Sequence, residues 1–250
     1  MLKILVTGAT GNVGQEVLSL LQSHDCNICA GVRNLNNAKH LLGNNIQCVP
    51  FDFTNPDTFD HAFFEVNKLF LVPPPALANI RLQIAPALNA AKLALFEHIV
   101  FLSILGAERN RFLPHSQIER YINQLGIKAT FLRASFFMQN LNTTHREDIK
   151  VHSELLLRAG NGKTSFIDVR DIAAVAVRTL IEDGHQERAY PLIGAEALTY
   201  YEVADIFTSV LGKPIRYNPS VLNFVRQMRS KRLPIDFILV MVAIYTSARL

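Results

Sequence analysis

The residues best suited to chemistry lie at the start of the chain, where three glycines follow an apolar segment. They have the spacing G-x-x-G-x-x-G, between the run LKILVT and a stretch with the apolar period of a helix. Glycine lets a backbone turn sharply and approach a diphosphate, while a helix start offers N–H groups and a positive dipole. The pattern predicts a dinucleotide phosphate loop, with a tight structural turn as the alternative. The predicted loop residues are Gly8, Thr10, Gly11, Asn12, Val13 and Gly14.

The end of the second predicted strand indicates which dinucleotide would bind. NAD sites place an acidic residue about 20 residues after the glycines, where it holds the ribose 2′-hydroxyl. This chain instead has Arg33, 19 residues after Gly14, with Lys39 nearby. A guanidinium can pair with a 2′-phosphate through two hydrogen bonds, so we expect NADP(H) in preference to NAD(H). The alternative is an arginine that only faces solvent.

Two further strand ends carry candidate contacts to the cofactor. Asp52 and Phe53 end the third predicted strand and could bracket an adenine through a hydrogen bond and an apolar contact. Pro73 and Pro74 follow the fourth strand, where a stiff loop with few N–H donors suits an apolar wall near the ribose or nicotinamide. Open α/β sheets bind ligands at the carboxyl ends of their strands, although an ordinary loop role is equally expected at both places.

The elements that would position these residues alternate between strand and helix. Short apolar runs predict buried parallel strands, and apolar residues at helical spacing predict the helices between them. This alternation predicts an α/β, doubly wound parallel sheet of the Rossmann type. The predicted strands are 2–7, 27–33, 46–51, 68–72, 99–103 and 128–133, and the later helices are 35–42, 56–65, 80–95, 116–125, 172–182 and 200–211.

The strict alternation loosens after about residue 135. We therefore expect a dinucleotide-binding domain over residues 1–139, its sheet completed by later segments, and a smaller C-terminal lobe for substrate or partner over residues 140–250. Thr199 is placed to begin the helix 200–211, and Gly212 to end it.

Composition excludes several other classes of protein. With 250 residues, 49% hydrophobic and 18% charged, the chain is neither disordered nor fibrous. Its longest apolar run, Ile235–Tyr245, contains Asp236 and is too short to span a membrane. The net charge of +4 is too mild to indicate nucleic-acid binding. No zinc-site spacing accompanies the Cys26–Cys29 pair, so no metal is expected.

We expect a cytoplasmic protein with free thiols. The three cysteines are an odd number, and the first residues run into glycines without the long apolar stretch of a signal peptide.

Several segments in order resemble the NmrA-like family of atypical short-chain dehydrogenases and reductases. They are TGATGNVG, Val32-Arg33, SILGA from Ser103, HSQIE from His115, LRASFFMQN from Leu132 and FIDVRDIA from Phe166. The resemblance implies NAD(P) binding. It also implies reduction of quinones, azo dyes or triphenylmethane dyes, or else nucleotide sensing without turnover. Since such relatives commonly have a further terminal segment, the lobe is expected to be variant or truncated.

The resemblance also suggests where catalysis would occur. Ser103 ends the fifth strand, where short-chain dehydrogenases have a serine, but no Tyr-x-x-x-Lys follows it. His115 stands where the lysine would fall and Arg111 where the tyrosine would. His115 could hydrogen-bond the ribose or donate a proton near neutral pH, and a helix cap or surface residue is the alternative. We take Ser103 and His115 as the candidate catalytic residues, both also contacting the cofactor.

Side chains after the sixth strand are candidates for the remaining contacts. Ser135 and Phe136 are expected at the cofactor, and Phe137 and Asn140 at the substrate, because aromatic side chains there suit a planar apolar acceptor. Packing between lobe and sheet is an equally expected role for the aromatic residues.

Together these patterns favour a reductase that transfers hydride from NADPH to a small, planar, quinone-like or dye-like acceptor. The alternative is a non-catalytic, NADP(H)-sensing regulator that acts through a protein partner. A nucleotide-sugar epimerase is disfavoured by the missing Tyr-x-x-x-Lys. Neither nucleic acid nor membrane is expected as a partner, and a homodimer is left open.

Overall fold

We describe the fold from a computed structural model, which places residues 1–74, 76–77, 79–233, 235, 238–239 and 241–242. The apolar run at residues 235–245 lies largely outside these residues. The chain forms two compact units, each built from two stretches: 1–133 with 169–191, and 134–168 with 192–250. This differs from the division expected at residue 139, because the second unit begins at Ala134 and residues 169–191 return to the first unit.

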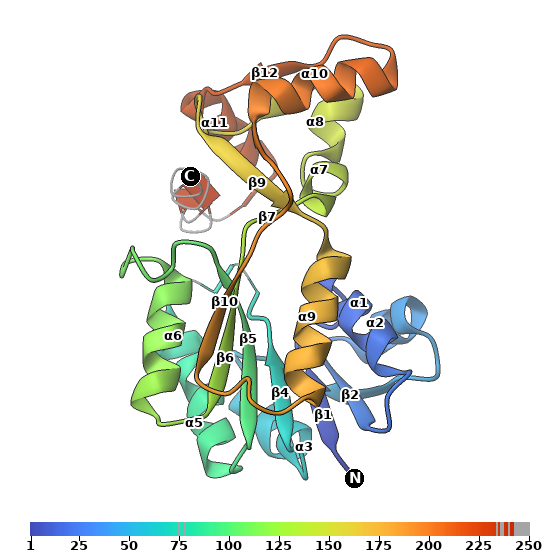
Figure 1. Cartoon of the computed structure of the whole chain (residues 1–250), viewed down its shortest axis with the longest axis vertical. Helices are drawn as coiled ribbons and strands as arrows, with labels where there is room; N and C mark the ends of the chain where they lie inside the picture. The colour runs from blue at the N-terminus through green and yellow to red at the C-terminus, as the bar shows by residue number, and fades with distance from the viewer. Residues whose placement is uncertain (75, 78, 234, 236–237, 240, 243–250) are drawn as a thin grey trace. The chain divides into compact units, whose positions relative to one another are not determined.

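The first unit is built on a seven-stranded parallel sheet in the order β10-β6-β5-β4-β1-β2-β3 (Figure 1). Its order reverses between β1 and β4, which is the position where doubly wound sheets bind nucleotides. At the β10 edge, the Glu187 N–H donates to the Ala129 carbonyl and the Ser135 N–H to the Leu192 carbonyl, so β10 runs parallel to β6. The strands are β1 (Lys3–Val6), β2 (Asn27–Val32), β3 (Gln47–Pro50), β4 (Lys68–Leu71), β5 (His98–Ile104), β6 (Ala129–Ala134) and β10 (Arg188–Leu192).

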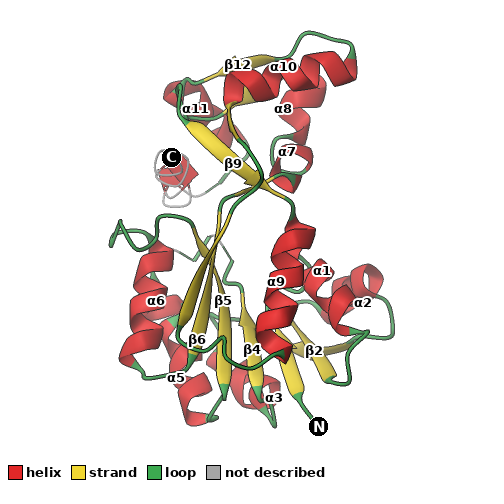
Figure 2. Cartoon of the chain, viewed as in Figure 1, coloured by secondary structure: helices red, strands yellow, loops and turns green. Residues whose placement is uncertain are grey.

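Helices cover both faces of this sheet (Figure 2). On one face α1 packs against α9, whose Ile172, Ala176 and Leu180 are fully buried. The other face carries α3 to α6, which share an apolar core with alternate residues of the strands. The helices are α1 (Asn12–Leu21), α2 (Leu35–Leu42), η1 (Pro56–Thr58), α3 (Phe59–Phe63), α4 (Ile80–Gln83), α5 (Ala85–Leu93), α6 (Pro114–Gln124) and α9 (Val169–Ile181). The predicted doubly wound α/β fold is therefore confirmed.

A group of phenylalanines fills the core beneath β3. Phe51 meets Phe53 edge to face at 4.8 Å between ring centroids, and Phe63 meets Phe96 in the same way at 5.0 Å. Each fully buried phenylalanine stabilises the fold by about 1.5–3 kcal/mol relative to an exposed one. This packing fixes the ends of β3 and of the loop that follows it.

The second unit has two small sheets, β11-β9-β7 and β12-β8. Its core contains Phe136, Phe166, Tyr200 and Phe224. As the sequence predicts, Thr199 begins α10 through a capping box and Gly212 ends it at φ +64°. The elements are β7 (Phe136–Phe137), α7 (Gln139–Asn142), α8 (Arg146–Val151), β8 (Glu154–Leu156), β9 (Lys163–Ile167), β11 (Ala197–Thr199), α10 (Tyr200–Leu211), β12 (Arg216–Asn218) and α11 (Val221–Ser230).

No helix in the described part of the chain is both long enough and apolar enough to cross a bilayer.

Candidate functional site

The glycine loop joins β1 to α1 at the point where the strand order reverses. Gly8 has φ +61°, and a Cβ added there would lie 2.8 Å from the Cβ of Val72. The Gly11 N–H donates to the Gly8 carbonyl at 2.9 Å. A Cβ at Gly14 would overlap that same carbonyl oxygen. Two of the three glycines are thus required by the loop's own packing, which holds α1 close against the end of β1.

Thr7 fixes the position of this loop. Its side chain is fully buried, and its hydroxyl donates to the Phe70 carbonyl at 3.0 Å while accepting from the Val72 N–H at 2.8 Å. These bonds join the ends of β1 and β4, the two strands that flank the reversal. In the sequence, Thr7 is marked only as a hydroxyl residue between the strand and the first glycine, which is too weak a signal to predict this role.

The start of α1 is left free of side-chain capping. Gly11 occupies the N-cap position and no side chain bonds to the first helical N–H groups. The Gln15 amide donates to the Thr10 carbonyl at 3.0 Å and braces the turn. A ten-residue helix that begins this way at the carboxyl edge of the sheet presents N–H donors and a positive dipole end. These features fit the diphosphate of a dinucleotide.

The two predicted cations lie just beyond β2. Arg33 follows the last residue of that strand, and Lys39 lies on α2; both are exposed. The neighbouring Asn34 side chain accepts from the Asn37 N–H at 3.0 Å, so it caps α2. Arg33 thus lies exposed just past the carboxyl end of β2, and its contact with a ribose 2′-phosphate stays a prediction.

The other strand-end candidates are engaged in local structure. Asp52 accepts from the Thr54 N–H and hydroxyl at 2.9 and 2.8 Å, which shapes its loop. Phe53 is only 5% exposed and belongs to the phenylalanine core. Pro73 and Pro74 are half-buried after β4, and Pro75 lies outside the described residues. Contacts from these residues to an adenine or a ribose stay predictions.

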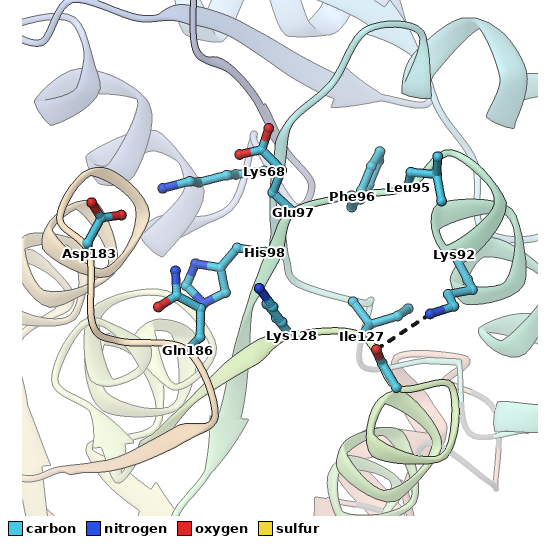
Figure 3. A pocket seen from close by; sticks show the side chains of 11 residues that line it. Lys68, Lys92, Leu95, Phe96, Glu97, His98, Ile127, Lys128, Asp183 and Gln186 are labelled. Carbon is cyan, nitrogen blue, oxygen red and sulfur yellow. Dashed lines mark hydrogen bonds between the residues drawn. The ribbon is translucent and has the colours of Figure 1, made fainter.

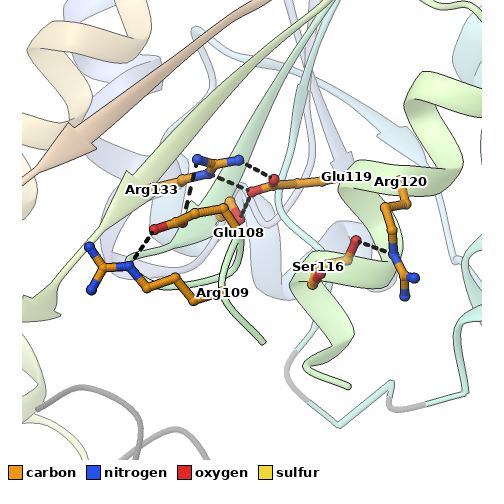
Figure 4. Close-up of polar contacts among 7 residues, drawn as sticks. Glu108, Arg109, Ser116, Glu119, Arg120 and Arg133 are labelled. Atoms are coloured by element: carbon orange, nitrogen blue, oxygen red, sulfur yellow. Dashed lines mark hydrogen bonds and ion pairs between the residues drawn. The ribbon is translucent and has the colours of Figure 1, made fainter. Parts of the chain in front are cut away.

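Ser103 lies in a polar cluster at the carboxyl ends of β5 and β6. Figure 4 shows the ion pair of this cluster, between Glu119 and Arg133. Only 1% exposed, Ser103 donates its hydroxyl proton to Glu119 Oε1 at 2.5 Å. Arg133 donates two hydrogen bonds to the same carboxylate, from Nε at 3.1 Å and from Nη2 at 2.7 Å. The hydrogen bond to Glu119 is the main cause that raises the pKa of Arg133. The Ser103 proton is therefore held by an ion pair, and its catalytic role stays a prediction.

His115 lies in the first turn of α6 with its ring over Phe101, 6.0 Å between centroids and 21° between planes. Its Nδ1 is buried and has no hydrogen-bond partner among the described residues. Burial lowers the pKa of His115 to about 4. The ring is therefore neutral at neutral pH and has no imidazolium proton to donate, although a hydrogen bond to a ribose stays a prediction.

The remaining candidates belong to the second unit. The Ser135 N–H is used in the bond to Leu192. Phe136 is 8% exposed and packs edge to face against Phe166 at 5.4 Å, so its aromatic type is explained by the core. Phe137 is half-buried on β7, and Asn140 on α7 is partly exposed. Their contacts to cofactor or substrate stay predictions.

Comparison with known proteins places this arrangement among reductases. The NAD(P)H azoreductase of Xenophilus azovorans is 36% identical over 230 residues, which cover 90% of this chain and 79% of that protein. Quinone oxidoreductase 2 of Escherichia coli (strain K12) is 30% identical over 237 residues, covering 92% and 82%.

Solved structures agree with these relatives. The NADPH-dependent quinone oxidoreductase QOR2 of Escherichia coli, complexed with NADPH, aligns with a TM-score of 0.83 and 28% identity, covering 98% of this chain and 88% of that one. The Citrobacter sp. triphenylmethane reductase complexed with NADP(H) aligns with a TM-score of 0.79 and 28% identity, covering 97% and 88%. Residues 2–248 match the NmrA-like family. The resemblance seen in the sequence motifs is thereby confirmed, and the chain belongs to the NmrA-like family.

Proposed function

We propose that this protein binds NADP(H) at the glycine loop and reduces a small, planar, electron-poor acceptor of the quinone or dye type. The observation that carries the proposal is the uncapped start of α1, held by Thr7 and the glycines where the strand order reverses. Its relatives include an azoreductase, a quinone oxidoreductase and a triphenylmethane reductase, two of them with NADP(H) in their solved structures.

The residues of the loop have distinct parts in binding. The N–H groups at the start of α1 would hold the diphosphate, and Arg33 would pair with the 2′-phosphate. Thr7 and Gln15 would keep the loop in the shape that presents those N–H groups. When bound, the nicotinamide supplies the hydride.

The state of the candidate acids favours the proposed acceptor class. The Ser103 hydroxyl donates its hydrogen bond to Glu119, and His115 is neutral at neutral pH. A quinone or a cationic dye is already electrophilic and accepts hydride with little help from an acid. Such acceptors suit a chain that also lacks the Tyr-x-x-x-Lys pair.

Consumption of NADPH with a panel of quinones, azo dyes and triphenylmethane dyes tests the function, together with calorimetric titration of NADPH. We expect binding and turnover with at least one acceptor. Tight binding without any turnover would instead support the NADP(H)-sensing regulator that acts through a protein partner. If neither NADPH nor NADH binds, both the reductase and the regulator are ruled out.

The preference for NADP(H) over NAD(H) is tested at Arg33. Because loss of a charge-assisted hydrogen-bond pair weakens binding about ten- to a hundred-fold, we expect that loss for NADPH in Arg33→Asp. Affinity for NADH should be little changed. Arg188→Asp, at an exposed arginine that begins β10, is the matched control. Equal losses for both coenzymes would remove Arg33 from the role.

A further inference from the structure

The first unit's sheet has polar groups at both edges, and one of these edges faces the proposed reaction. The cavity drawn in Figure 3 lies at the amino-terminal edge, where Lys68 begins β4 and Lys128 precedes β6. Because the strands are parallel, the glycine loop lies at the opposite, carboxyl-terminal edge. Groups that act on a hydride acceptor must therefore come from the carboxyl ends of the strands.

The strand order indicates which carboxyl ends those are. Arg33 follows β2 on one side of the reversal between β1 and β4, while β4, β5 and β6 lie on the other side. A dinucleotide binds across such a reversal. With its adenosine ribose at Arg33, as in the proposed function, the coenzyme would have its nicotinamide half over β4, β5 and β6.

Arg133, near the end of β6, is held in one orientation by Glu119 (Figure 4). Its Nε and Nη2 donate to the two oxygens of that carboxylate at 3.1 and 2.7 Å. Glu119 is only 5% exposed and also accepts from the Ser103 hydroxyl, so the carboxylate is fixed from two sides. A guanidinium has five N–H groups in one plane, and two of those on Arg133 are used in this pair.

The other edge of the guanidinium, formed by Nη1 and the second N–H of Nη2, points away from Glu119. The Glu108 carboxylate lies 3.4 Å from Nη1, which is longer than an N–H···O hydrogen bond. The Glu108 side chain is 37% exposed and that of Arg133 is 20% exposed, so the contact between them lies at the surface. Glu108 also pairs with the exposed Arg109 at 3.5 Å. A carboxylate oxygen thus lies beside Nη1 without a hydrogen bond that holds it there.

The charges of this cluster balance, and this balance limits what the cluster can do. The carboxylates of Glu108 and Glu119 offset the guanidinium groups of Arg109 and Arg133. Such a cluster does not collect anions from solution. It supplies N–H donors of fixed direction, as the neutral backbone N–H groups of an oxyanion hole do. The cluster therefore suits a negative charge that develops during a reaction.

We propose, on the basis of the proposed function, that Arg133 is a catalytic residue whose free N–H groups donate to a quinone oxygen as hydride arrives. The quinone receives the hydrogen and its electron pair from the nicotinamide C–H bond on one oxygen. Negative charge builds on its other oxygen, which accepts from Arg133 and later takes a proton from water. A cationic triphenylmethane dye takes the same hydride on carbon and becomes neutral, so it forms no anion. Arg133 should therefore accelerate the reduction of quinones and not that of cationic dyes.

Steady-state oxidation of NADPH by a series of neutral quinones and by a cationic triphenylmethane dye tests this role. Arg133→Lys keeps a cation beside Glu119 and loses the planar fork. We expect kcat with quinones to fall about a hundred-fold, and to fall most where the hydroquinone anion is most basic. The kcat with the dye and the Kd of NADPH should stay unchanged. In Glu108→Gln the competing carboxylate is gone, so kcat with quinones should rise about two- to five-fold, the factor that corresponds to an exposed ion pair.

Arg120→Lys is the matched control, because Arg120 on α6 is exposed and donates to the carbonyls of Arg111 and Ser116. It should reduce both kinds of acceptor as the wild type does. Equal losses with quinone and dye in Arg133→Lys would show a structural role and overturn the proposal, and so would no loss with either.

The wild type separates this proposal from the proposed function. If it reduces the dye and no quinone, Arg133 has no anion to stabilise and the proposal is overturned while the reductase stands. If it reduces quinones alone, an Arg133→Lys loss that does not vary with the basicity of the hydroquinone anion overturns it. A wild type that reduces neither overturns the reductase, and the role of Arg133 with it.

Discussion

Two histidines, His98 fully buried and His115 half-buried, show how strongly individual residues depend on their surroundings. Burial lowers the pKa of both His98 and His115 to about 4, and the positive Lys68 adds to the effect at His98. Since a histidine side chain has an ordinary pKa near 6.5, each ring would be partly charged at mildly acidic pH in an unfolded chain. In the folded protein they stay neutral. They differ in partners, because His98 is held by Thr130 and His115 packs on Phe101.

The His98 pKa predicts a loss of stability in acid. Above pH 6.5 neither state binds the proton, so the free energy of unfolding gains nothing from this group. As pH falls from 6.5 towards 4, His98 binds a proton in the unfolded chain but not in the folded chain, so the free energy of unfolding declines. At about 1.4 kcal/mol per pKa unit, the full loss at His98 is about 3 kcal/mol.

Urea unfolding at several pH values between these limits measures that decline. His98→Asn should remove about half of the decline, because His115 has a similarly lowered pKa and contributes the rest, whereas His24→Asn, at an exposed histidine, should leave the slope as it is. A decline of the same steepness in the wild type and in His98→Asn would show that other groups cause it.

At the residue scale, sequence reasoning located the groups that depend on local geometry. Gly8 and Gly14 are required by the turn that their spacing predicted. Glu119 was missed, because its partners Ser103 and Arg133 lie 16 and 14 residues away in the chain and meet it only in the fold. Phe136 illustrates the converse limit, since an aromatic residue suits a ligand and a core equally well until its neighbours are known.

At the scale of elements, strong local signals were sufficient. The helices predicted at residues 35–42 and 200–211 have the bounds of α2 and α10. The single helix predicted at residues 80–95 is wrong, because it divides into α4 and α5. Pro86 in the first turn of α5 has no N–H for the carbonyl of Leu82, so the hydrogen-bond ladder stops there. None of the strands from β7 to β12 was predicted; β7, β8, β11 and β12 have only two or three residues and acquire their pairing from distant partners.

The residue just after α5 offers a stabilising substitution. Leu95 has φ +57°, a left-handed conformation that is unfavourable for a residue with a Cβ, and its side chain is 81% exposed. Leu95→Gly should therefore raise the free energy of unfolding by about 1 kcal/mol. Leu93→Gly, equally exposed but helical, should lower it by about 1 kcal/mol.

Thermal or urea unfolding of the two variants beside the wild type gives the comparison. If both glycines destabilise the protein to the same extent, the left-handed backbone at residue 95 stores no strain.

At the scale of the molecule, the chain passes between its two units three times, after residues 133, 168 and 191. Sequence reasoning placed one boundary at residue 139 because the strand–helix alternation weakens there. It could not place α9 in the first unit, since the apolar face of α9 is matched by α1, more than 150 residues earlier.

This arrangement predicts how fragments behave. A fragment of residues 1–139 lacks α9 and β10, so it exposes the apolar face of α1 and the edge of β6. We expect it to show no cooperative unfolding transition by circular dichroism. The fragment 1–191 contains every residue of the first unit and should unfold in a cooperative transition. A cooperative transition in the shorter fragment would mean that α9 is dispensable for the first unit.

The interleaving of the units also sets an order of events during synthesis. The ribosome synthesises residues 134–168, which belong to the second unit, before residues 169–191, which complete the first unit. The incomplete first sheet therefore stays exposed on one side during this interval. Nascent chains would then be most prone to misassociation after residue 133 has emerged and before residue 191 has emerged. Chaperone dependence should accordingly peak late in translation, not when the first glycine-bearing turn appears.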